Sequence, residues 1–388
     1  MIKGFKVRLF PTPKQEEKLM DNVHACRFFW NWMVAYQEEY YKNGGRFLSK
    51  FSMIKLITKL RNTEEYKWMQ SFSSRLFADI CGDLDFAYNR FFKKLSKGPN
   101  FKKKRTAKKS FPTRYDRMRF CNGCVHLEKI GNIKVKSNYE MMFEKQHKFI
   151  NPRVSFDNGK WILSFALECE NQTFKLTDNA LGIDLGVKKL AVVSFGKRVL
   201  QYDNINKSRR VKKLKSKMKH IQRVIDRKYR VGNELHPSRK WLKSNNILKY
   251  EDLLKKIQRK LNNIRLDYIH KITHELVAMK PKVIGMEDLN VSGMIKNAHL
   301  SKVISEQYFY EFIRQMKYKS EWYGIKFVQV PRFFPSSKSC SHCGEIKKDL
   351  KLSERIFICP HCGQEIDRDL NAAINLKMYA VSTLETTA

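Results

Sequence analysis

The chain has 388 residues, of which 42% are hydrophobic, and its 77 lysines and arginines outnumber 38 acidic residues to leave a formal net charge of +39. A compact protein with this charge repels itself unless a polyanion neutralises it, which points to nucleic acid as a partner. The sequence has no apolar run of about 18 residues and no apolar leader at its start, so we expect neither a membrane span nor a membrane partner.

The first 180 residues predict a β domain that is interrupted by helices. Residues 2–10 alternate apolar and polar side chains, as a half-buried strand does, and residues 12–15 (Thr-Pro-Lys-Gln) have the cap hydroxyl, proline and glutamine of a helix start. Apolar residues at helical spacing follow, and then short alternating runs separated by Asn-Gly and Gly-Asn turn signals. We therefore expect residues 1–11 and 98–180 to form a small β-barrel, with residues 12–97 as a helical insert.

Two segments are basic enough to predict nucleic-acid contacts. The first follows Gly98-Pro99 and contains Lys102, Lys103, Lys104 and Arg105 without an acid between them; a flexible linker is the alternative. The second runs from residue 207 to residue 230, with twelve basic residues and one acid, and keeps an apolar stripe at helical spacing. One side of such a helix packs while the other faces a polyanion. Its predicted contacts are Arg209, Arg210, Lys212, Lys213, Lys215, Lys217 and Lys219.

From residue 181 the pattern changes to alternating strands and helices, which predicts an α/β core. Asp184 lies inside one predicted strand, Glu287 ends another, and Asp369 precedes a run rich in alanine. A carboxylate on a buried strand is costly unless it binds a metal or pairs with a cation. If the three converge, they could hold two divalent cations about 4 Å apart, and Mg²⁺ is the ion that fits carboxylates and phosphates. Capping of an element, or pairing with a lysine, is the simpler alternative.

Four cysteines form the strongest local motif. The spacing C-x2-C-x15-C-x2-C is made by Cys340, Cys343, Cys359 and Cys362. Two such pairs supply four thiolates for a tetrahedral Zn²⁺, and a filled site of this kind is structural because it leaves no position for water. A third pair, Cys121 and Cys124, encloses Asn-Gly and fits a hairpin turn better than a metal site.

Three segments resemble, in order, the three RuvC motifs of the TnpB family. They are Gly182-Ile183-Asp184-Leu185-Gly186-Val187-Lys188, then Gly285-Met286-Glu287-Asp288-Leu289-Asn290, then Asp367-Arg368-Asp369-Leu370-Asn371-Ala372-Ala373-Ile374-Asn375. Residues 335–344 are similar to the start of the family's zinc ribbon. The stretch from Lys6 to Pro13 is more weakly similar to the family's opening.

The resemblance implies an α+β multidomain protein: the β-barrel would be wedge-like, and residues 181–388 would be an RNase H-like RuvC nuclease domain with a zinc ribbon inserted at residues 335–366. It implies a transposon-encoded, RNA-guided DNA endonuclease that binds a guide RNA and double-stranded DNA beside a short DNA motif. Asp184, Glu287 and Asp369 would be the catalytic acids at a two-ion Mg²⁺ site. Asp369 is preferred over Asp367 by the family pattern, and Arg368 would steady the scissile phosphate or pair with a neighbouring acid.

Three other functions stay open at the level of sequence. A miniature type V CRISPR effector nuclease has the same core and chemistry, a transposase joins strands with the same fold, and a nucleic-acid-binding regulator would be non-catalytic. The three intact acids argue against the regulator. We expect a location in the prokaryotic cytoplasm, at the nucleoid when DNA is bound, and a monomer is favoured.

Overall fold

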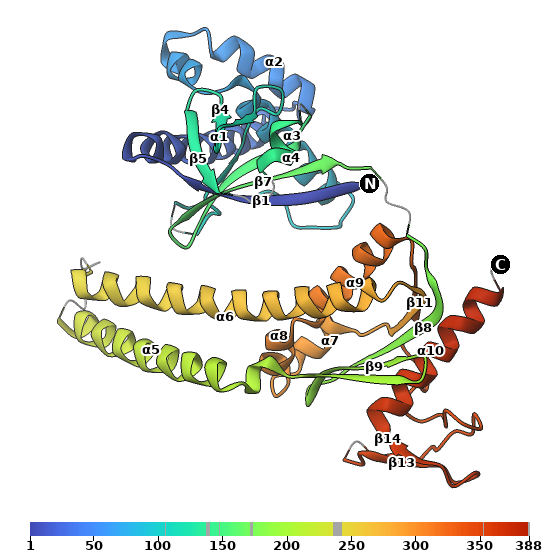
Figure 1. Cartoon of the computed structure of the whole chain (residues 1–388). Coiled ribbons are helices and arrows are strands. Elements are labelled where there is room, and N and C mark those ends of the chain that lie inside the picture. Colours follow the sequence, from blue (N-terminus) through green and yellow to red (C-terminus); the bar gives the residue numbers. More distant parts are fainter. Residues whose placement is uncertain are drawn as a thin grey trace. The chain divides into compact units, whose positions relative to one another are not determined.

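A computed structural model describes residues 1–104, 106–136, 140–146, 148–170, 174–235, 243–351 and 353–386. The chain divides into two compact units, residues 1–170 and residues 171–388 (Figure 1). The first strand of the second unit begins at Thr177, four residues before the predicted nuclease boundary at residue 181, and that boundary stays a prediction.

The first unit is built on a seven-stranded sheet with the order β2-β6-β7-β1-β5-β4-β3. The strands are β1 (Ile2–Phe10), β2 (Ser110–Pro112), β3 (Arg119–Cys121), β4 (Cys124–Leu127), β5 (Gly131–Lys136), β6 (Ile150–Asp157) and β7 (Lys160–Glu168). The N-terminal strand therefore joins the later meander at its centre, antiparallel to β7 and β5. The expected β-barrel takes the form of a half-barrel sheet, with β2 and β3 at its edges.

The helices of the first unit share one hydrophobic core with this sheet. They are α1 (Pro13–Lys42), α2 (Lys50–Leu60), the 3-10 helix η1 (Glu64–Ser71), α3 (Ser74–Phe92) and the short α4 (Glu140–Glu144). The predicted start of α1 is confirmed: Thr12 caps the backbone of Gln15, and the Gln15 side chain caps Thr12 in return. The hairpin between Cys121 and Cys124 is also confirmed, since these residues pair across the β3–β4 turn.

The second unit contains the predicted α/β core. Its five-stranded sheet has the order β10-β9-β8-β11-β12, with strands β8 (Thr177–Leu185), β9 (Lys189–Phe195), β10 (Arg198–Asp203), β11 (Pro281–Glu287) and β12 (Lys326–Val330). β8, β9 and β10 pair antiparallel, whereas β8, β11 and β12 run parallel. Such a mixed sheet needs helical crossovers between its parallel strands.

Helices cover both faces of this sheet. They are η2 (Ile205–Lys207), α5 (Arg209–Leu235), α6 (Asn245–Ala278), α7 (Val291–Lys296), α8 (Ser301–Gln307), α9 (Phe309–Tyr323) and α10 (Arg368–Thr386). Leu181 and Ile183 of β8 pack in one core with α6 and α9, while α10 lies against the opposite face. α5 and α6 pack side by side as a long helical pair (Figure 1). Within the described ranges, every helix is too short or too polar to cross a bilayer.

Candidate active site and cysteine ribbon

Two glycines and two carboxylates occupy matching positions on the central parallel strands. Gly182 of β8 pairs in register with Gly285 of β11. Side chains alternate between the faces of a sheet, so residues two positions further along point to the same face as these glycines. Those residues are Asp184 and Glu287. The sheet therefore places both predicted acids side by side, on the face that carries α10.

Helix α10 lies directly on the two glycines. A Cβ atom at Gly182 would come within 1.9 Å of the carbonyl oxygen of Ala373, and one at Gly285 within 2.3 Å of that of Leu376. Only glycine allows the helix backbone to approach the strands this closely. Asp369 lies in the first turn of the helix, one turn before Ala373. The helix thus brings the third acid to the sheet face that bears the other two.

The three acids form no ion pair in the part of the chain that the structure describes. Among the residues that the structure describes, the side chains of Asp184, Glu287 and Asp369 form neither a hydrogen bond nor an ion pair, although the chain carries 77 lysines and arginines. All three are half-buried. Unpaired carboxylates that face one another in this way require a cation to be stable when ionised.

The electrostatics reflect this crowding. Burial raises the pKa of Asp184 well above its usual range, and the carboxylates of Asp369 and Glu287 raise it further, against the opposing charge of Arg368. Burial also raises the pKa of Glu287, with a smaller contribution from Asp288. Asp184, Glu287 and Asp369 are not among the described side chains whose ligand atoms gather in a tight metal-binding cluster. Within the described part of the chain, only the four cysteines form such a cluster.

The neighbouring acids have other partners. Asp288 forms an ion pair with Arg332 at 2.9 Å and accepts a hydrogen bond from Gln329. One oxygen of Asp367 accepts hydrogen bonds from the backbone N–H groups of Asp369 and Leu370 at 3.1 and 3.0 Å, which caps the start of α10. These contacts favour Glu287 and Asp369 over their neighbours as metal ligands.

Arg368, the supporting residue of the sequence-based prediction, is held by the ribbon. Its guanidinium donates to the carbonyl oxygens of Lys351 and Glu354 at 3.2 and 3.5 Å. Its charge nevertheless lowers the pKa of Asp184, so its field reaches the acids. A phosphate contact for this residue stays a prediction.

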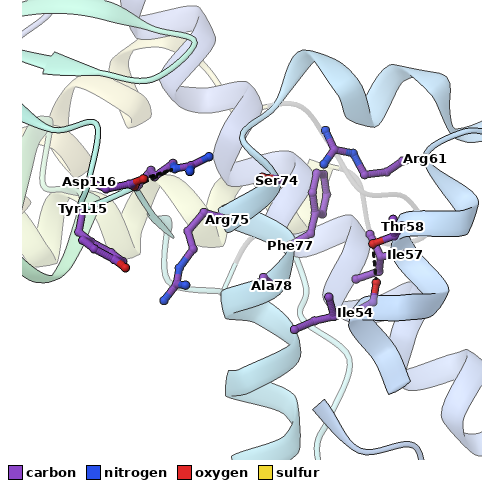
Figure 2. Close-up of a pocket in the computed structure, with 11 residues that line it drawn as sticks. Ile54, Ile57, Thr58, Arg61, Ser74, Arg75, Phe77, Ala78, Tyr115 and Asp116 are labelled. Carbon is purple, nitrogen blue, oxygen red and sulfur yellow. Dashed lines mark hydrogen bonds and ion pairs between the residues drawn. The ribbon is translucent and has the colours of Figure 1, made fainter. Parts of the chain in front are cut away.

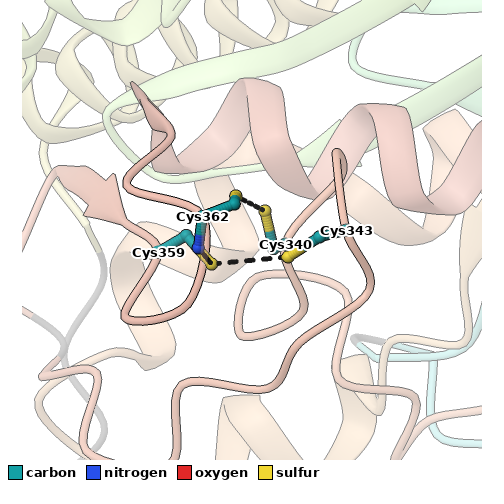
Figure 3. Close-up of side chains that lie close together, drawn as sticks. All are labelled: Cys340, Cys343, Cys359 and Cys362. Carbon is teal, nitrogen blue, oxygen red and sulfur yellow. Dashed lines mark hydrogen bonds between the residues drawn. The ribbon is translucent and has the colours of Figure 1, made fainter.

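The four cysteines converge on one point in the ribbon (Figure 3). Their sulfur atoms all lie within 4.8 Å of one another, with 3.7 Å between those of Cys340 and Cys362 and 3.6 Å between those of Cys343 and Cys359. Four thiols at this spacing have the chemistry of a closed, tetrahedral zinc site. Backbone N–H groups, chiefly that of Cys362, lower the pKa of Cys359 to about 6, because they stabilise its thiolate.

The backbone of the ribbon is arranged around these ligands. Each cysteine pair is followed by a glycine with positive φ, Gly344 at +81° and Gly363 at +70°, which lets the chain turn back on itself. The antiparallel strands β13 (Ile356–Ile358) and β14 (Glu365–Asp367) lie before and after the second cysteine pair, with Phe357 fully buried beside Cys340 and Cys359. The ribbon core is small, so a metal would supply much of its folding free energy.

The basic helix α5 exposes most of its predicted contacts. The exposed residues are Arg209, Arg210, Lys212, Lys213, Lys217 and Lys219. Lys215 differs, since its ammonium is half-buried and forms an ion pair with Glu306, which Arg265 also contacts at 3.3 Å. Val211, Ile221 and Ile225 form the buried stripe against α6. One side of α5 therefore packs and the other presents positive charge.

The Lys102–Lys104 stretch is fixed to α1. Asn31 exchanges two hydrogen bonds with the backbone of Lys102, at 2.7 and 3.1 Å, and the Trp30 indole donates to the carbonyl of Asn100. The Lys102 ammonium lies 3.3 Å from the centre of the Trp30 ring, and burial lowers its pKa to about 8. Lys103 and Lys104 are exposed, and Arg105 lies outside the described residues. These contacts hold Asn100 and Lys102 against α1, which favours an ordered segment over the linker alternative at these two residues.

A basic cavity of about 360 Å³ opens beside this stretch. Its charged lining consists of His24, Arg27, Lys102, Lys104, Lys108, Lys109, Arg153 and one acid, Asp83. Asp83 pairs with Arg153, whereas in the described structure the side chains of Arg27, Lys104 and Lys108 have no acidic partner. Burial lowers the pKa of His24, and the charges of Lys104 and Arg27 lower it further. The cavity therefore has a positive potential that an anion would neutralise.

A second cavity of about 280 Å³ lies between α2, α3 and the loop after β2 (Figure 2). Its arginines already have partners inside the protein. Arg75 pairs with Asp79 at 2.8 Å, Arg114 pairs with Asp116 at 2.7 Å, and Arg61 lies over the ring of Phe77. This cavity consequently has less unbalanced positive charge than the first.

Three family models match the chain. They are described as a helix-turn-helix domain of the OrfB_IS605 type over residues 1–46, a probable transposase, OrfB_IS605, over residues 164–298, and a Cas12f1-like TNB domain over residues 309–376. In this structure residues 1–46 consist of β1 and the single long helix α1. The third model covers α9, β12, the cysteine ribbon and the first half of α10.

Relatives align along nearly the whole chain. It is 28% identical to the putative RNA-guided DNA endonuclease InsQ of Escherichia coli strain K12, over 97% of this chain and 91% of that protein. It is 27% identical to a putative RNA-guided DNA endonuclease of Streptomyces pristinaespiralis, over 96% and 88%. The CRISPR-associated endodeoxyribonuclease Cas12f1 of Sulfoacidibacillus thermotolerans is 28% identical, over 56% and 50%.

A solved structure has a similar fold. The protein chain of a Cas12f1–sgRNA–target DNA complex aligns with a TM-score of 0.59 at 13% identity, covering 97% of this chain and 98% of that one. At this identity the likeness concerns the fold alone.

Proposed function

Because this chain belongs to the TnpB family, we propose that it is an RNA-guided DNA endonuclease encoded by an insertion sequence, which hydrolyses target DNA next to a short motif. One observation carries the proposal. Asp184 and Glu287 stand side by side on neighbouring parallel strands, α10 brings Asp369 to the same face, and none of the three side chains forms an ion pair within the described structure.

In this proposal, Asp184, Glu287 and Asp369 hold divalent metal in an RNase H-like nuclease domain. Bound Mg²⁺ would activate water and stabilise the leaving oxygen of a phosphodiester. The chain's own part is to aim the carboxylates at one face. Gly182 and Gly285 do so by letting α10 lie on the strands, and Asp367 does so by capping the turn that holds Asp369.

We assign structural Zn²⁺ to the four cysteines. The thiol cluster, the N–H groups that stabilise a thiolate at Cys359 and the small core around Phe357 support this assignment. The site would have no open position, so its contribution is to the fold of the ribbon and of the helix that follows it.

The nucleic acids are assigned to the positive surfaces. The exposed face of α5 would contact the backbone phosphates of guide RNA or of its duplex with target DNA. Its six exposed basic residues can neutralise phosphates, which releases the counterions bound to the nucleic acid. In the first unit, the basic cavity would hold a backbone phosphate against Arg27, Lys104 and Lys108. The predicted domain boundaries, with a recognition domain before residue 181 and a nuclease domain after it, belong to this proposal.

The test separates chemistry from binding. Asp184→Ala should abolish Mg²⁺-dependent cleavage of matched DNA while guide and target binding stay near wild-type strength, since one charge in a net of +39 barely alters the field. Asp369→Ala should behave in the same way. Asp367→Ala is the matched control: it removes a helix cap, at a cost of about 1 kcal/mol in stability, and should retain substantial cleavage.

The outcomes discriminate between the candidate functions. Wild-type cleavage by Asp184→Ala would contradict the active-site assignment. Joint loss of binding and cleavage would make Asp184 structural and favour a non-catalytic regulator. The type V CRISPR alternative is supported by the sequence similarity to a Cas12f1 protein, and it differs in the source of the guide. Sequencing the RNA that co-purifies with the protein distinguishes a transposon-end guide from a CRISPR guide, and absence of a defined RNA would favour a transposase.

A further inference from the structure

Helix α10 is bound, within its first two turns, to the loop that carries the first cysteine pair. The Oδ1 atom of Asn371 accepts a hydrogen bond from the backbone N–H of Ser341 at 2.9 Å, and its Nδ2 donates to the carbonyl oxygen of Ser339 at 2.7 Å. Ser339 and Ser341 flank Cys340 in the sequence. One side-chain amide therefore holds the backbone on both sides of a ribbon cysteine.

Asn375 extends this contact by one helical turn. Its Nδ2 donates to the carbonyl oxygens of Ser339 and Ser336, each at 2.7 Å. The side chains of Asn371 and Asn375 are buried, at 0% and 6% exposure, so water cannot replace these partners. Their spacing of four residues puts both amides on one face of the helix.

Another face of α10 is fixed to the sheet through the close contacts at Gly182 and Gly285. Asp369 precedes Asn371 by two residues, in the turn where the ribbon ends and the helix begins. Its distance from Asp184 consequently depends on two supports, the sheet below the helix and the ribbon beside its first turns. If the ribbon unfolds, the first turn loses the second support.

We propose that Asn371 and Asn375 are positioning residues that couple the folded state of the cysteine ribbon to Asp369, so that the three carboxylates bind divalent metal at full strength only when the ribbon is folded on its zinc. This inference rests on the proposed role of Asp369 as a metal ligand. It makes one metal site depend on the other through two side-chain amides.

The test measures metal binding without nucleic acid and without cleavage. Full-length wild type and Asn371→Leu, which keeps the branched shape and the number of heavy atoms but removes both hydrogen bonds, are titrated with Mn²⁺ by electron paramagnetic resonance before and after zinc removal. Zinc is measured by elemental analysis. Asn371→Leu should keep its zinc yet bind Mn²⁺ about tenfold more weakly, the usual loss when a partner that orients a metal ligand is removed. Zinc removal should weaken Mn²⁺ binding in wild type and add little in Asn371→Leu, because the link is already broken there.

Two results would overturn the proposal. One is that zinc removal weakens Mn²⁺ binding equally in wild type and in Asn371→Leu, since the coupling would then not depend on the Asn371 amide. The other is loss of zinc from Asn371→Leu itself, which would make the amide a support for the ribbon alone. Asn375→Leu should also keep its zinc and bind Mn²⁺ more weakly than wild type, by a smaller factor, and it replaces Asn371→Leu if that variant does not fold. Ser382→Ala, at the exposed end of α10, is the control and should match wild type. If wild type and Asp184→Ala bind Mn²⁺ alike, the proposed carboxylate site itself fails, and the coupling that rests on it fails with it.

Discussion

Replacing Gly182 by alanine tests whether the approach of α10 to the sheet sets the geometry of the acids. The new Cβ would lie 1.9 Å from the carbonyl oxygen of Ala373 and 2.5 Å from the backbone nitrogen of Lys377. Both neighbours are helix backbone, so no side chain can rotate away. The helix must recede by about 1.5 Å to restore ordinary van der Waals separation.

This displacement has two expected consequences. Overpacking of a well-packed core costs about 1–3 kcal/mol, so the free energy of unfolding should fall by that amount in urea titrations followed by circular dichroism. A catalytic group misplaced by about 1 Å can cost roughly 100-fold in rate, and Asp369 moves with the helix, so cleavage should fall by about that factor. RNA binding should be unchanged, because the exposed face of α5 is untouched.

A graded series supplies the control. At Gly285 the nearest helix atom is 2.3 Å from the new Cβ, so the required shift and the expected loss are smaller. At Gly4 the Cβ meets nothing within 4 Å, so Gly4→Ala should behave as wild type. If Gly182→Ala matches Gly4→Ala in both stability and cleavage, the contact between α10 and the strands does not position Asp369.

Three further predictions concern the cysteines, the basic helix and the buried carboxyl. Cys343→Ser or Cys362→Ser should lose one zinc per chain and loosen residues 335–376; full zinc content by elemental analysis would contradict the assignment. Replacing Lys212, Lys213, Lys217 and Lys219 together by Glu should weaken RNA binding and make it less dependent on salt concentration. Lys215→Glu should chiefly destabilise the protein, because the new carboxylate would repel Glu306. An unchanged salt dependence in the fourfold variant would mean that the exposed face of α5 contacts no phosphate. The pKa of Asp184 is raised in the folded protein, so its contribution to folding stability is fully present below the ordinary carboxyl pKa and is lost as pH rises through the raised value. In buffer without divalent metal, Asp184→Asn should therefore be more stable than wild type at neutral pH and equal to it in acid. Equal stability of the two proteins at both pH values would refute the argument that burial raises the pKa of Asp184.

Local chemistry could be predicted from the sequence alone. The capping box at Thr12 and Gln15, the hairpin at Cys121 and Cys124, and the cysteine pairs of the ribbon each depend on residues within a few positions of one another. The alternation of apolar residues likewise defines the strands that carry Asp184 and Glu287. The order of the three acid motifs, together with the ribbon, was enough to indicate the TnpB family.

What the tertiary structure decided depends on contacts between distant segments. Whether the first sheet closes is set by its edge strands β2 and β3, which no local pattern relates. Which lysines face solvent depends on partners far along the chain, as the ion pair of Lys215 with Glu306 and the contact of Lys102 with Trp30 illustrate. An isolated glycine in an apolar strand signals close approach by another backbone, but not by which one.

Helix α10 shows the same difference between local sequence and tertiary contacts at the candidate active site. The sequence contains Asn371 and Asn375 inside a recognisable motif, yet asparagine in a helix has no defined partner until the chain folds back on itself. Only the packing of α10 between the sheet and the ribbon pairs these amides with the backbone around Cys340 and brings Asp369 to the face of Asp184. The sequence determined which side-chain groups are present, because their chemistry is local. The fold decided which of these groups meet, because a contact across nearly 200 residues depends on how all the intervening elements pack.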